Sequence, residues 1–125
     1  MHNLVLIVGT KENFAAAKEL YPQDDTGYNF DFFGYDYITP LDECPLRKYG
    51  FQDSELGPFT KADAQYEKYV KRRMYYECLD LRYPEQQDWN IVIVDNTDDE
   101  PEKEIQHFFD SLPEDATFFF CDGHC

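Results

Sequence analysis

The sequence predicts an α/β fold: a single layered domain with a mostly parallel sheet of about four strands, one bent aromatic edge strand, and helices on the sheet faces. Two runs of consecutive apolar residues, at 4–8 and 91–94, support this prediction. Such runs are typical of strands buried on both faces, as the strands of parallel sheets are. The length of 125 residues fits one domain, so we expect residues 1–125 to form a single unit.

Residues typical of helices lie between the expected strands. Thr10 is a candidate N-cap for a first helix, which presents Phe14 and Ala17 on one face. Apolar spacing and prolines predict three further elements: a long helix over 60–81, a helix over 101–112 and a last strand over 117–121. Because helices connect the strands, the crossover rule favours parallel pairing.

An aromatic segment at 28–37 predicts the bent edge strand. Its aromatic residues alternate with polar ones, and the alternation slips by one position between Phe32 and Phe33, beside Gly34. A slip of one residue is typical of a β-bulge, and the polar face indicates an edge or antiparallel strand. A long irregular loop is expected at about 39–59, where prolines and glycines interrupt any regular period.

Charge is the strongest signal in the composition. The chain has 26 acidic and 11 basic residues, a net charge of −15. This imbalance disfavours direct binding to nucleic acid or to an anionic membrane, because like charges repel. It favours a basic protein partner, which the field of the protein would attract. The simpler alternative is that the charge only keeps the protein soluble.

The expected location is the cytoplasm, or the bacterial host cytoplasm if a phage encodes the protein. The start of the chain lacks the basic segment of a signal peptide, and no apolar run approaches the length of a membrane span. The four cysteines are therefore expected to be reduced.

Acidic residues follow the strand at 91–94. In a parallel sheet, Gly9, Asp95 and Asp122 would all lie at strand ends on the same edge. Asp95, Asp98 and Asp122 could then bind Mg²⁺, which prefers carboxylate oxygens. The alternative is a solvated loop whose acids favour the start of the next helix.

The segment 4–20, together with the later Val92-Ile93-Val94-Asp95-Asn96-Thr97-Asp98, resembles Toprim domains. The resemblance implies an α/β fold that binds Mg²⁺ for phosphoryl transfer on nucleic acid. Toprim domains carry a glutamate directly before the first glycine, where this chain has Val8, and their acids follow an Asp-x-Asp pattern. The chain therefore resembles a degenerate Toprim domain.

Two further sites are possible. Gly9-Thr10-Lys11 at a helix start could bind phosphate through backbone N–H groups, although a simple capped turn explains the same residues. A zinc site could use Cys121, His124 and Cys125, with a fourth ligand from Cys44, Cys78 or His107. Cys78 is otherwise expected to be a small core residue.

The preferred functional prediction is an acidic, non-enzymatic inhibitor that binds a basic, nucleic-acid-binding protein such as a nuclease. In size and charge the chain resembles anti-restriction, anti-CRISPR and nuclease-immunity proteins. The predicted partner-binding residues are acidic and lie in two segments: Asp42, Glu43, Asp95, Asp98, Asp99, Glu100 and Glu102. The alternatives are a small Mg²⁺-dependent α/β phosphoryl-transfer or nucleotide-binding protein, and a structural interaction module.

Overall fold

The computed structural model describes residues 2–20, 35, 37–44, 56–63, 66, 70, 75–85, 91–95 and 103–124, with only the backbone at 75, 91–95 and 103–106. The elements in chain order are β1 (His2–Val8), α1 (Lys11–Leu20), β2 (Tyr37–Pro40), β3 (Phe59–Thr60), β4 (Tyr75–Asp80), β5 (Ile91–Asp95), α2 (Lys103–Ser111) and β6 (Thr117–His124). Neither helix of the described part has the length and apolar character needed to cross a membrane.

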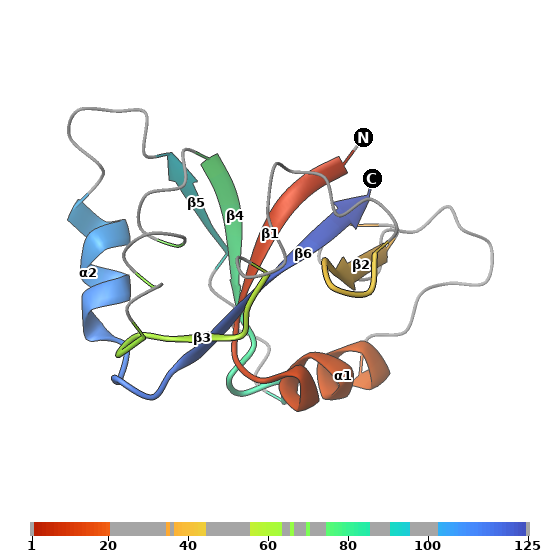
Figure 1. Ribbon diagram of the computed structural model, residues 1–125, viewed down its shortest axis with the longest axis horizontal. Helices are drawn as coiled ribbons and strands as arrows, with labels where there is room; N and C mark the ends of the chain where they lie inside the picture. Colours follow the sequence, from red (N-terminus) through yellow and green to blue (C-terminus); the bar gives the residue numbers. More distant parts are fainter. Residues whose placement is uncertain are drawn as a thin grey trace.

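The strands form one mixed sheet in the order β2-β6-β1-β4-β5, and β3 pairs with the same strand β6 nearer its start (Figure 1). Among the described strands, β1 and β4 are the one parallel pair. The pairs β1–β6, β2–β6, β3–β6 and β4–β5 are antiparallel. The prediction of a mostly parallel four-stranded sheet was therefore wrong.

Two-sided burial explains why the strand direction was misjudged. Side chains of β1 and β6 enter one core on one face of the sheet and a second core on the other. Both strands are therefore continuous in apolar residues even though they run antiparallel. A continuous apolar run indicates that a strand is buried on both faces. It does not indicate whether the neighbouring strand runs parallel or antiparallel.

The predicted helix over 60–81 was also wrong at both ends, because Thr60 belongs to β3 and residues 61–63 form a turn. Residues 75–80 form β4, which joins β1 to β5. Tyr76 and Cys78 lie in the first core and Leu79 in the second, which is the alternation of a strand. Cys78 is fully buried, so its expected role as a small core residue is confirmed.

The predicted bent strand at 28–37 lies outside the described residues except for Tyr35 and Tyr37. An edge strand of the described sheet begins at Tyr37, so the start of the loop predicted at about 39–59 belongs to β2 and its end to β3. Within that loop, residues 45–55 lie outside the described part.

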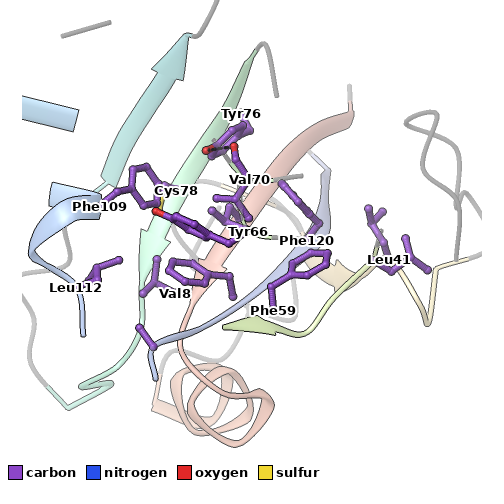
Figure 2. Packing of buried hydrophobic residues seen from close by; sticks show 14 residues of the cluster. Val8, Leu41, Phe59, Tyr66, Val70, Tyr76, Cys78, Phe109, Leu112 and Phe120 are labelled. Carbon is purple, nitrogen blue, oxygen red and sulfur yellow. Dashed lines mark hydrogen bonds between the residues drawn. The ribbon is translucent and has the colours of Figure 1, made fainter. Parts of the chain in front are cut away.

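The first core lies between the sheet and α2. Figure 2 shows Phe109 of α2, and Leu112 directly after this helix, directed toward Val8, Cys78 and the aromatic rings of the sheet. Tyr66 and Val70 fill the same core, and the hydroxyl of Tyr76 donates a hydrogen bond of 2.7 Å to the carbonyl of Val70. This bond compensates the buried hydroxyl and fixes the segment that carries Val70 to β4.

The second core lies under α1, on the opposite face of the sheet. Phe14 and Ala17, the two positions predicted to form the apolar face of this helix, are buried there. The predicted N-cap is also present, because Thr10 Oγ1 accepts a hydrogen bond of 3.0 Å from the Asn13 N–H. The Asn13 side chain accepts one of 2.9 Å from the Thr10 N–H in return, so the helix start is closed reciprocally.

Candidate functional site

Asp122 in β6 is fully buried and is the one buried charged residue of the described part. Nδ1 of His2 lies 2.9 Å from each of its two carboxylate oxygens. The Cys44 thiol donates to Asp122 Oδ2 at 3.6 Å. A buried carboxylate is costly without such partners, so His2 and Cys44 offset the loss of water around Asp122.

The register of the sheet brings these residues together. His2 lies opposite His124, and Leu4 lies opposite Asp122. Because alternate residues of a strand share a face, His2, Asp122 and His124 lie on the face of the first core. On the other side of β6, Tyr37 of β2 lies opposite His124. The site therefore lies at the end of the sheet where β1 begins and β6 ends.

Three rings pack against one another beside the buried carboxylate: those of His2, His124 and Tyr37. His124 stacks on Tyr37, with 5.1 Å between ring centroids and 4° between ring planes. His2 meets His124 edge to face, at 4.8 Å and 67°. The His2 side chain is 36% exposed, whereas Asp122 is 0% exposed. We call His2, Tyr37, Cys44, Asp122 and His124 the histidine cluster; it opens to solvent at His2 and Tyr37.

A histidine held in this way has defined chemistry. Asp122 occupies Nδ1 of His2, which leaves Nε2 on the opposite side of the ring. An imidazole with one nitrogen fixed by a carboxylate can accept a proton or bind a metal ion through the other nitrogen. Sequence patterns missed this pair because its members are 120 positions apart. The one local signal was an aspartate directly after the apolar run that ends at Cys121.

The predicted acidic edge is arranged differently. Gly9 bonds to the carbonyl of Thr117 at 2.7 Å, at the end of β6 away from Asp122. Asp95 lies opposite Tyr75 in β4, at the same end of the sheet as Asp122, but β1 and β4 stand between their strands. Three strand spacings separate the two backbones by about 14 Å. The expectation that all three residues lie at one edge was therefore wrong for Gly9, whereas Asp95 and Asp122 do lie at the same end of the sheet.

The predicted magnesium site of Asp95, Asp98 and Asp122 assumed that these acids lie together at one edge of a parallel sheet. The described residues contain no group of three or more His, Cys, Asp or Glu side chains placed to hold a metal ion. Asp98 lies outside the described part, so this alternative stays an untested prediction.

The predicted partner-binding acids are only partly described. Asp42 and Glu43 are exposed, and Lys11 Nζ lies 2.5 Å from Asp42 Oδ2 and 3.8 Å from Glu43 Oε1. Lys11 therefore neutralises one of the two negative charges at this place. The backbone of Asp95 ends β5. The remaining predicted residues lie outside the described part: Asp98, Asp99, Glu100 and Glu102.

Backbone N–H groups at the alternative phosphate site, Gly9-Thr10-Lys11, already have hydrogen-bond partners within the protein. The N–H groups of Gly9, Thr10 and Asn13 bond to Thr117, to the Asn13 side chain and to Thr10, respectively. Lys11 pairs with Asp42. The capped turn therefore accounts for these three N–H groups and for the Lys11 side chain.

The predicted zinc ligands are divided by the sheet. Cys121 is fully buried in the second core, whereas His124 lies in the histidine cluster on the opposite face. Burial raises the pKa of the Cys78 and Cys121 thiols, which disfavours the thiolate that zinc requires. Cys125 lies outside the described residues. Cys121 and His124 are thus not placed to bind the same ion.

No protein-family model, curated protein or solved structure matches the chain.

Proposed function

We propose that this protein is an acidic, non-enzymatic inhibitor that binds a basic, nucleic-acid-binding partner such as a nuclease. The observation that carries the proposal is the net charge of −15 on a 125-residue chain. Carboxylates take the places of phosphates opposite Arg and Lys, with which they form strong charge-assisted hydrogen bonds. A field of this sign also speeds the encounter with a basic surface.

Exposed acids on the described surface support this proposal. Asp42 and Glu43 together outnumber their one cationic partner, Lys11. At the other end of the molecule, Asp110, Glu114 and Asp115 are exposed around the turn from α2 to β6.

The test starts from immobilised protein that captures partners from a bacterial lysate at low salt, in the presence of EDTA. The purified partner is then titrated with the protein at rising salt concentration. We expect a basic partner, an affinity that falls steeply with salt, and loss of the partner's nucleic-acid binding in the complex. Affinity that does not change between about 50 and 500 mM salt would contradict electrostatic competition.

Paired variants locate the surface. The double change Asp42→Asn with Glu43→Gln removes the acids predicted to bind, and we expect it to weaken the complex about tenfold, largely through slower association. The double change Asp110→Asn with Glu114→Gln removes the same charge at the far end of the molecule. Equal losses from both pairs would mean that total charge, rather than the predicted surface, governs binding.

A further inference from the structure

We propose that His2 and His124 form a binding site for a divalent transition-metal ion such as Zn²⁺, with Asp122 holding His2 in position from behind. The proposal goes beyond partner binding and does not depend on it. It rests on the geometry of the histidine cluster, where two imidazoles meet at the surface above a buried carboxylate.

The first argument is the orientation of His2. Its Nδ1 lies 2.9 Å from both oxygens of Asp122, a residue that is fully buried. Nε2 therefore faces away from the carboxylate, and the His2 side chain that carries it is 36% exposed. Metal-binding histidines almost always donate their second ring N–H to a carboxylate, a carbonyl or water, which fixes the ring and makes the imidazole a better ligand.

The second argument is the distance to His124. Because each ligating nitrogen lies about 2 Å from the ion, two imidazoles on one tetrahedral zinc have ring centres about 5 Å apart. The centroids of His2 and His124 are 4.8 Å apart. Tyr37 stacks on the His124 ring. The ring centroids therefore have the separation of two imidazoles on one ion, and binding requires the rings to turn from their edge-to-face packing until one nitrogen of each faces the ion.

The chemistry of the cluster favours particular ions. Imidazole nitrogen suits Zn²⁺, Cu²⁺ and Ni²⁺, whereas Mg²⁺ and Ca²⁺ prefer oxygen ligands. Within the described residues no third side chain completes the set, since the Cys44 thiol bonds to Asp122 on the buried side. With two protein ligands, we expect lower affinity than at a closed structural zinc site. This ligand pair differs from the predicted set of Cys121, His124 and Cys125.

The third histidine of the chain provides a matched control. His107 lies on α2 and is exposed, in a different part of the molecule from the cluster. The full chain, stripped with EDTA, is titrated with zinc sulfate while the imidazole nitrogen signals are followed by NMR. We expect the signals of His2 and His124 to shift together and those of His107 to stay unchanged. Equal shifts of all three would indicate nonspecific binding and overturn the proposal.

Variants test the same site through affinity and thermal stability. We expect zinc to raise the melting temperature of the wild-type protein and of His107→Gln by several degrees. His124→Gln should lower zinc affinity at least tenfold, and Asp122→Asn, which keeps a hydrogen-bond acceptor for His2, should lower it by about 10- to 100-fold. Zinc affinity in His124→Gln equal to that of wild type would overturn the proposal. No partner is present in these measurements, so their failure leaves the inhibitor proposal intact.

Discussion

The ring of Tyr35 lies directly against Gly123. A Cβ atom added at position 123 would stand 2.8 Å from both Cδ1 and Cε1 of Tyr35, and 2.9 Å from Cγ2 of Val5. The hydroxyl of the same tyrosine donates a hydrogen bond to Glu77. Tyr35 therefore crosses β6 and β1 and reaches β4, and the absence of a side chain at position 123 is what lets it lie flat on the sheet.

Gly123→Ala should destabilise the protein by about 1–3 kcal/mol, because the added methyl group overpacks this contact. Urea unfolding of both proteins measures the loss. The control is the same substitution in a Tyr35→Ala background, where the ring is gone and the cost of alanine should fall by at least half. An unchanged cost in that background would show that the ring is not the source of the strain.

Glu77 should make stability depend on pH. Desolvation raises the pKa of Glu77 above its ordinary value of 4.5. The folded state thus binds the proton more tightly than the unfolded state. The resulting stabilisation is fully present below pH 4.5 and is lost as pH rises through the folded-state pKa. Glu77→Gln retains an acceptor for Tyr35 without the charge, so its stability relative to wild type should increase from pH 4 to pH 7. A difference that stays constant across urea melts in this range would refute the assignment.

Lys61 closes the C-terminal end of α2. Its Nζ donates hydrogen bonds of 2.9 Å to the carbonyls of Asp110 and Leu112. A cation at this end also interacts favourably with the helix dipole, so Lys61→Met should cost about 0.5–1.5 kcal/mol. Lys61→Arg, which keeps both the charge and the donors, should recover most of that loss in the same thermal melt. If both variants lose equal stability, the packing of the lysine stem rather than the cap explains the effect.

The pair His2 and Asp122 should behave as one unit. His2→Leu removes a partner of a buried carboxylate and should destabilise the protein by about 1–3 kcal/mol at pH 7. Asp122→Asn removes the charge that needs compensation, so the double variant should lose less stability than the sum of the two single changes. Additive losses in urea unfolding would mean that the two side chains stabilise the fold independently.

Elements defined by short-range signals were predictable from the sequence. The N-cap at Thr10 and the buried positions Phe14 and Ala17 locate α1, and the apolar runs locate β1, β5 and β6. These signals lie within a few residues of one another. The residues of β4 were read as a helix because the apolar positions before them recur at intervals of four, among them Tyr66 and Val70.

Pairing direction and the histidine cluster depend on distant parts of the chain. Nothing near Val8 specifies that β6 will run antiparallel beside β1. The acidic edge followed from the assumed parallel direction, so the error in the sheet carried over to the placement of Gly9, which lies at the opposite end from Asp95 and Asp122. His2 and His124 are far apart in the sequence, and the register of β1 against β6 makes them neighbours.

The place of β6 between β1 and β2 also determines when the domain can assemble. His2 and Asp122 are 120 positions apart, so β1 emerges from the ribosome long before the strand that completes the middle of the sheet. Closing so large a loop costs entropy before any contact repays it, and proteins dominated by such pairings fold in about milliseconds to seconds. Until β6 has been synthesised, the edges of β1 and β2 that pair with it lack their hydrogen-bonding partner. A nascent chain therefore exposes aggregation-prone strand edges until β6 has been synthesised, and its large negative charge helps to keep chains apart.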